Sequence, residues 1–238
     1  MSLSFIPLGV GDAFSRRFYS SCLALEADGQ LLLVDCPHPI RKMLKEAADG
    51  SGVGLDVDRV SGVALTHLHA DHSSGLEGAG YFCHALGRRM PVLAHPDVSA
   101  SLWEHHLRAG MEELGNHFGD FFELLPLSYE RPVAFGAFQL ECRRTIHPVP
   151  ATAFRIRAGG RSLGISADTS FDPELIFWLA AADLVVHETN VGVHTPYEAL
   201  AALPAELRAR MRLIHYPDDF DSGASAIEPL VQGRRYEV

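Results

Sequence analysis

Three histidines and an aspartate stand close together in the segment Thr66-His67-Leu68-His69-Ala70-Asp71-His72. Imidazole nitrogen and carboxylate oxygen are ligands that zinc and similar divalent ions favour. A compact loop can present His67 and His69 to one ion, and Asp71 and His72 then face a second. Two ions about 3.5–4 Å apart can share a bridging hydroxide, which is a nucleophile at neutral pH. The segment therefore predicts a metal-dependent hydrolase with a dinuclear site, with a polar surface loop as the alternative.

One loop cannot fill two coordination shells, so further ligands must follow it in the chain. His147, Asp168 and His215 each stand where an expected strand runs out. Open α/β sheets assemble their sites at such strand ends. Each residue alone has an ordinary alternative, such as a helix or turn cap for Asp168. Taken in order after the cluster, the three predict the remaining metal ligands.

Strands and helices alternate in both halves of the chain, and these elements must position the candidate ligands. Expected strands cover 21–26, 31–35, 60–66, 91–94, 153–156, 162–166, 184–187 and 212–215, with a further hairpin over 132–146. Expected helices cover 40–48, 98–114 with Asp97 as cap, 173–181 and 196–203, and a small-residue, glycine-rich segment follows the histidine cluster. This order predicts an α/β or α+β class with mixed sheets.

Length and composition fit a globular hydrolase with a real core. The 238 residues, 47% of them hydrophobic, suit one domain over 1–238 or two small halves sharing a core. The four cysteines form no CxxC pair, which favours reduced thiols. A formal charge of −10 disfavours a nucleic-acid partner. With no apolar segment long enough for a membrane span or signal peptide, we expect a cytoplasmic protein.

The ordered candidates resemble the metallo-β-lactamase superfamily over nearly the full length of the chain. The resemblance rests on Thr66–His72, then His147, Asp168 and His215, together with the early strand and turn Leu8-Gly9-Val10-Gly11-Asp12. It implies a four-layer αββα sandwich with the metals in the groove between the edges of two sheets. It also implies these ligand sets: His67, His69 and His147 on the first metal, Asp71, His72 and His215 on the second, and Asp168 bridging.

Asp35 matches the acidic residue that supports the metal loop in that superfamily. A hydrogen bond from its carboxylate to a ligand imidazole would fix the tautomer of that ring. The alternative is a simple turn former at the end of the strand over 31–35.

The segment His187-Glu188-Thr189-Asn190, followed by His194-Thr195, resembles the ribonuclease Z and phosphodiesterase branch. His187 would donate a proton to the leaving oxygen and Glu188 would orient it, so these two join Asp71 as candidate catalytic residues. A backbone hydrogen bond at the strand end is the alternative for His187, and His194 could touch substrate or cap a helix. The chain departs from this branch in its short 189–193 segment and in Tyr216-Pro217-Asp218-Asp219 after the last histidine.

The acidic charge and the absence of a glycine- and proline-rich basic arm point away from RNA and towards a small phosphodiester, cyclic or a headgroup ester. The segment 115–123 offers instead Phe118, Phe121 and Phe122. These phenylalanines predict a lid or a homodimer surface beside the site, with plain core packing as the alternative.

Several other functions stay open at this point. The same fold could hydrolyse a thioester, lactone or amide, or act as a ribonuclease Z-like nuclease. A redox di-iron protein of the flavodiiron sort would carry Glu where this chain has His69. A metal-binding accessory protein without turnover is the non-enzymatic alternative. Zinc is the default metal for this ligand set, and manganese or iron could bind similar shells.

Overall fold

The computed structural model describes residues 2–112 and 115–238, whose strands form two seven-stranded sheets. The first sheet runs in the order β14 (Tyr236–Glu237), β1 (Ser4–Gly9), β2 (Cys22–Ala27), β3 (Gln30–Val34), β4 (Val60–Ala64), β5 (Met90–Ala94) and β6 (Phe122–Pro126). The second runs in the order β13 (Glu228–Pro229), β12 (Met211–Ile214), β11 (Leu184–Glu188), β10 (Arg161–Ile165), β9 (Thr152–Ala158), β8 (Phe138–Arg144) and β7 (Val133–Phe135).

Each sheet changes from antiparallel to parallel pairing along its width. Strands β1 to β3 pair antiparallel and β3 to β6 pair parallel. In the second sheet, β7 to β10 pair antiparallel and β10 to β13 pair parallel. Because parallel strands end at the same edge, the carboxyl ends of several strands meet there in each sheet. The expected class with mixed sheets is confirmed.

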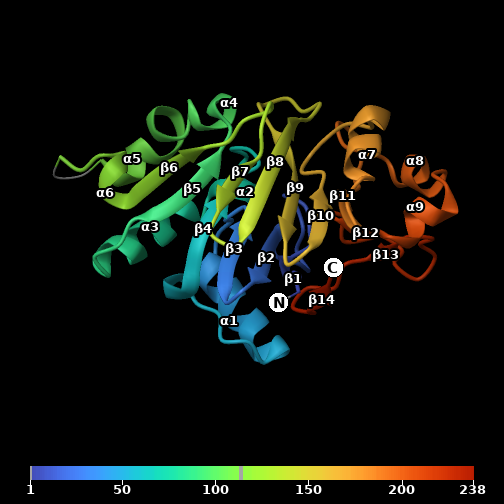
Figure 1. The fold of residues 1–238 in the computed structure, drawn as a ribbon, viewed down its shortest axis with the longest axis horizontal. Helices are drawn as coiled ribbons and strands as arrows, with labels where there is room; N and C mark the ends of the chain where they lie inside the picture. Colours follow the sequence, from blue (N-terminus) through green and yellow to red (C-terminus); the bar gives the residue numbers. More distant parts are fainter. Residues whose placement is uncertain (1, 113–114) are drawn as a thin grey trace.

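Apart from the short helical turn 70–73, which lies among the strand ends, the helices lie outside the two sheets, which occupy the centre of Figure 1. They are α1 (Ile40–Ser51), α2 (Ala70–Ser73), α3 (Leu76–Ala85), α4 (Pro96–Ser99), α5 (Arg108–Met111), α6 (Phe118–Phe121), α7 (Pro173–Leu179), α8 (Tyr197–Ala201) and α9 (Ala205–Ala209). Helix α1 ends at Gly52, whose φ of 71° lies in the left-handed region that a glycine cap adopts. In the described ranges, no helix has the length and apolarity that a membrane span requires.

Alternating side chains of the inner strands divide between two apolar clusters. Leu32 and Val34 of β3 pack between the sheets with Phe154 of β9, whereas Leu31 and Leu33 face α1 and α3 on the other side. Successive side chains of a strand point to opposite faces, so a strand buried on both sides is apolar throughout. The arrangement is the expected αββα sandwich, since α7 and α8 cover the second sheet.

The glycine-rich segment after the histidine cluster is helical, which its composition did not predict. Gly80 lies in α3 where a Cβ atom would come within 2.5 Å of the Phe122 ring. The glycine therefore lets α3 pack closely on β6, and this contact outweighs its low helix propensity.

The predicted helix over 98–114 is broken into separate turns. Helix α4 is followed by a π-helical turn, Trp103–Leu107, and then by α5, which ends at Met111. The predicted end at residue 114 lies outside the described residues. Asp97 is not the cap, because His95 precedes the helix and its Nδ1 accepts a hydrogen bond from the Asp97 backbone N–H at 3.1 Å.

The phenylalanines of 115–123 pack in the core, so the predicted lid or dimer surface is wrong for them. Phe121 and Phe122 are fully buried, and Phe118 packs against the same cluster. Their burial against α3 is the ordinary core packing that was the alternative.

Replacing Phe121 by Ala should therefore lower the free energy of unfolding by about 3–5 kcal/mol, because it removes a buried ring that contacts Tyr81 at 5.0 Å between centroids. Urea unfolding followed by circular dichroism measures the change. Phe177→Ala is the control, since that ring is 83% exposed and its loss should cost under about 0.5 kcal/mol. If the Phe121 variant is as stable as the unmodified protein, Phe121 is not a core residue and the predicted lid or dimer surface stands.

Candidate metal centre

The candidate ligands lie where the strands of the two sheets end. Those ends carry Asp35 after β3, the loop Thr66–His72 after β4, His147 after β8, Asp168 after β10, Glu188 at the end of β11 and His215 after β12. The backbone is in the left-handed region at Asp35, Ala167 and His215, with φ of 64°, 52° and 59°. Such conformations cost free energy in non-glycine residues and concentrate at functional sites. The strand ends therefore turn sharply to aim these side chains inward.

Asp35 supports the candidate metal-binding loop, Thr66–His72, through hydrogen bonds to two of its residues. Its carboxylate accepts hydrogen bonds from the Thr66 backbone N–H at 2.8 Å and from the Thr66 hydroxyl at 2.8 and 2.9 Å. It also contacts Nδ1 of His72 at 2.8 Å. Since the Thr66 proton goes to Asp35, Thr66 Oγ1 accepts from Nδ1 of His67 at 2.9 Å. Both rings thus carry their proton on Nδ1 and aim the Nε2 lone pair at the site.

The first group of donor atoms comprises His67, His69, His147 and Asp168, all within 4.8 Å of one another. Nδ1 of His69 lies 3.2 Å from Nε2 of His67 and 3.0 Å from Nε2 of His147. Three ring nitrogens converge there, and neutral imidazoles cannot all pair by hydrogen bonds. A divalent cation satisfies all three lone pairs at once, so these residues fit a metal ion.

The second group comprises Asp71, His72, Asp168 and His215, again within 4.8 Å. Nε2 of His72 lies 3.3 Å from a carboxylate oxygen of both Asp71 and Asp168. Nε2 of His215 lies 3.3 Å from Asp71. Among the described residues, Nε2 of His72 is buried without a hydrogen bond of normal geometry, which a metal ion would correct.

The electrostatics of the first group suit a cation directly, whereas the carboxylates around the second group raise the pKa of His72 and His215, so a cation binding there would displace protons. Burial lowers the pKa of His67, and it lowers the pKa of His147 to about 4, so both rings are neutral, as ligands must be. Burial alone would raise the pKa of Asp168, but His72 and His215 outweigh it and keep that pKa well below its ordinary value. Asp168 therefore stays ionised at the centre of the cluster.

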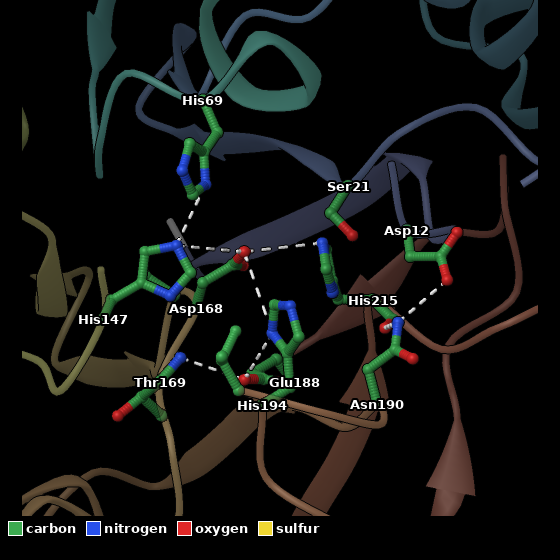
Figure 2. A network of polar contacts seen from close by, with 12 residues as sticks. Asp12, Ser21, His69, His147, Asp168, Thr169, Glu188, Asn190, His194 and His215 are labelled. Atoms are coloured by element: carbon green, nitrogen blue, oxygen red, sulfur yellow. Dashed lines mark hydrogen bonds and ion pairs between the residues drawn. The ribbon is translucent and has the colours of Figure 1, made fainter. Parts of the chain in front are cut away.

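A further pair, His194 and Glu188, lies against the same centre, as Figure 2 shows. Nδ1 of His194 is 3.1 Å from Oε1 of Glu188 and 3.9 Å from Oδ2 of Asp168. The Glu188 carboxylate is buried and accepts from the backbone N–H of Thr169 at 2.9 Å and of Thr195 at 3.3 Å. The carboxylate is thus fixed in place, and it orients the His194 ring.

The geometry corrects the prediction that His187 is the proton donor. Its ring is fully buried with Nδ1 2.7 Å from the Glu188 carbonyl oxygen, which is the backbone contact given as the alternative. Its Nε2 has no hydrogen-bond partner in the described part of the chain. His187 and Glu188 are consecutive in β11 and point to opposite faces, so only Glu188 reaches the site. It is His194, six residues beyond Glu188, whose ring contacts the Glu188 carboxylate, with Nδ1 3.1 Å from Oε1.

Two supporting contacts were not predicted from the sequence. Asn190 Nδ2 donates to Asp12 at 2.9 Å and to the His215 carbonyl oxygen at 3.1 Å, as seen in Figure 2. The Ser73 hydroxyl donates to the His69 carbonyl oxygen at 2.9 Å and lies 2.9 Å from Nε2 of His106. The contact of Ser73 with His69 is local, but no spacing rule links Asn190 to Asp12 or Ser73 to His106, which lie far apart in the chain.

Replacing Asp35 by Asn should lower metal affinity about 10- to 100-fold, because the amide cannot accept from both His72 and Thr66 as the carboxylate does. Metal retained after dialysis against a graded series of chelator concentrations measures the change. Asp56→Asn is the control, since Asp56 pairs with Arg41 on the surface at 3.0 Å. Equal metal retention in the two variants would contradict a supporting role for Asp35.

Comparison with known proteins agrees with this geometry. The chain matches the family model of Anti-Pycsar protein Apyc1 over residues 3–231. It is 30% identical over 243 residues to an Anti-Pycsar protein Apyc1 of Paenibacillus harenae, covering 97% of this chain and 98% of the relative. It is 28% identical over 249 residues to another from Paenibacillus sp. (strain J14), covering 100% and 99%.

Solved structures share the fold at low sequence identity. The metallo-β-lactamase fold protein YhfI from Bacillus subtilis aligns with a TM-score of 0.79 at 19% identity, covering all of both chains. A diphosphatase from the PhnP family aligns with a TM-score of 0.79 at 15% identity, covering 100% of this chain and 98% of its own. The short form of human tRNase Z aligns with a TM-score of 0.71 at 20% identity, covering 98% of each. The chain has the metallo-β-lactamase fold and belongs to the Anti-Pycsar protein Apyc1 family.

Proposed function

We propose that this chain is a metal-dependent hydrolase that cleaves a small phosphodiester with two divalent ions. The proposed ligands combine imidazole and carboxylate donors: His67, His69 and His147 for the first ion, Asp71, His72 and His215 for the second, and Asp168 for both. Zinc is the metal we expect, with manganese and iron as alternatives.

The position of Asp168 carries this proposal, because its carboxylate belongs to both groups of donor atoms. Oδ2 lies 3.7 Å from Nε2 of His67 on one side and 3.6 Å from Nε2 of His215 on the other. Oδ1 lies 3.3 Å from Nε2 of His72. A carboxylate that faces two sets of ligands is suited to two adjacent ions, whereas one ion would need only one set.

Bound ions of this kind polarise a phosphoryl oxygen and activate water at neutral pH. The chain itself supplies a proton donor at the same place, His194, whose ring is oriented by Glu188. An alkoxide is a poor leaving group and needs a proton as the ester bond breaks. A thiolate leaves without one, so a built-in proton donor favours an oxygen ester over a thioester.

The acidic surface favours a small substrate over RNA, since a net charge of −10 repels a polyanion. A cyclic nucleotide monophosphate is the substrate we favour, because it presents one phosphodiester on a compact molecule. The chain belongs to a family whose relatives are named anti-Pycsar proteins, and we extend the anti-Pycsar role to this chain.

A substrate panel tests the proposal on protein stripped of metal and reloaded with Zn²⁺ or Mn²⁺. It contains bis-p-nitrophenyl phosphate, purine and pyrimidine cyclic nucleotides, a glycerophosphodiester, an oligoribonucleotide, a thioester and a lactone. We expect metal-dependent turnover of the small phosphodiesters. Turnover of the thioester or lactone alone would refute phosphodiester cleavage, and preferred turnover of the oligoribonucleotide would make the protein a nuclease. If the protein binds its metal but turns over no substrate of the panel, it is a metal-binding accessory protein and not an enzyme.

A further inference from the structure

A cavity of about 550 Å³ opens beside the candidate metal centre. It lies between the 189–198 segment and the 217–224 loop, and His194 lines its wall. Because the His194 ring also belongs to a group of donor atoms with Glu188 and His215, the cavity and the metal centre share one side chain. A volume of this size accommodates a drug-sized organic molecule.

The cavity has an aromatic wall. Tyr197 and Phe220 line it, with ring centroids 5.3 Å apart and planes at 77°. The Tyr197 hydroxyl accepts from the Ala226 backbone N–H at 2.7 Å, which ties the ring to the opposite loop. Two rings held at a fixed angle form an apolar surface against which a flat ring can pack.

The cavity is also negatively charged. Three of its lining residues are Glu198, Asp219 and Asp221, and none is lysine or arginine. Asp221 accepts hydrogen bonds from two backbone N–H groups of its own loop, whereas Glu198 and Asp219 are exposed at the rim. A group that enters between them should be neutral with N–H donors or positively charged, because an anion would be repelled.

We propose that this cavity binds the leaving alcohol of the phosphodiester, and that the alcohol carries a flat ring with N–H donors or positive charge. The inference rests on the proposed function, since it takes His194 as the proton donor. Water adds its oxygen to phosphorus and gives up a proton to solvent. The P–O bond to the alcohol breaks, its electron pair stays on the leaving oxygen, and that oxygen takes the proton from His194, which solvent replaces. The part of the substrate that carries the leaving oxygen must therefore lie on the His194 side, where the cavity is, and in a cyclic diester this part stays attached to the product.

Aryl methyl phosphodiesters test the proposal, because the aryl oxide is their leaving group. Three substrates carry a trimethylammonium, an acetyl or a carboxylate group on the ring, and kcat/KM is measured for the protein and for Glu198→Lys and Asp219→Lys. We expect each variant to raise the ratio of kcat/KM for the carboxylate substrate to that for the ammonium substrate about tenfold at low ionic strength, and less at high salt. The intrinsic reactivity of each ester cancels when this ratio is compared between proteins.

Glu206→Lys is the control, because Glu206 is an exposed carboxylate on α9 that does not line the cavity. Its ratio should stay near that of the unmodified protein. If Glu198→Lys and Asp219→Lys change the ratio no more than Glu206→Lys does, the cavity does not hold the leaving group, although phosphodiester turnover itself would stand. If the metal-loaded protein cleaves no phosphodiester at all, the proposed function fails and the inference falls with it.

Discussion

Replacing Asp168 by Asn is expected to lower kcat/KM for phosphodiester hydrolysis about 1000-fold and to reduce the metal bound per chain. The buried carboxylate lies between His67 on one side and His72 and His215 on the other. Asn preserves its size and removes its charge, so two cations would meet in a site that lacks the shared anion. Losses of this order follow when a group that stabilises charge in an active site is removed.

The measurement combines elemental analysis with kinetics on the same preparation of the Asp168 variant. Asp172→Asn is the control, because Asp172 is the cap of α7, its side chain accepting from the Glu174 and Leu175 backbone N–H groups. Asparagine caps a helix about as well as aspartate, so this variant should keep its stability, its metal and its turnover. Full metal content and normal kcat/KM in the Asp168 variant would refute the shared-ligand assignment.

Replacing His194 by Ala is expected to lower kcat about 100- to 10,000-fold for an ester with a poor leaving group, while the metal content stays unchanged. The His194 ring is oriented by Glu188 and lies 3.9 Å from Asp168. The loss should be much smaller for bis-p-nitrophenyl phosphate, because nitrophenolate leaves without a proton. Comparing the two substrates separates loss of a proton donor from a general disturbance of the site.

Replacing His187 should have a different effect from replacing His194. His187 is fully buried and contacts a backbone carbonyl oxygen, so His187→Gln should lower thermal stability and leave kcat nearly unchanged in the folded protein. A folded His187 variant that loses turnover, beside a His194 variant that does not, would return the proton-donor role to His187.

The sequence located the strand ends better than it assigned roles to neighbouring side chains. Thr66–His72, His147, Asp168 and His215 were predicted because each follows an apolar strand, and strand ends gather at one edge of a sheet. His187 was chosen because it precedes Glu188, yet alternation along β11 places only one of the two at the site. The fold of the 189–195 segment, which returns His194 to Glu188, depends on tertiary contacts.

Tertiary contacts also explain where the fold departs from its prediction. Gly80 reads as a helix breaker, but the approach of Phe122 requires a residue without Cβ at that place in α3. The apolar spacing over 98–114 predicted one helix, whereas the structure interrupts it with a π-helical turn. The contact of His106 with Ser73 lies within that turn and supports the metal loop. Local periodicity could not predict a turn that serves a distant loop.

A metal titration tests the two-ion account most directly. Protein stripped of metal is titrated with Zn²⁺ or Mn²⁺, and bound metal per chain and phosphodiester turnover are measured at each addition. We expect turnover to rise as a second equivalent binds and to level off at two ions per chain. Full activity with one ion per chain, or undiminished activity in the stripped protein, would contradict the account.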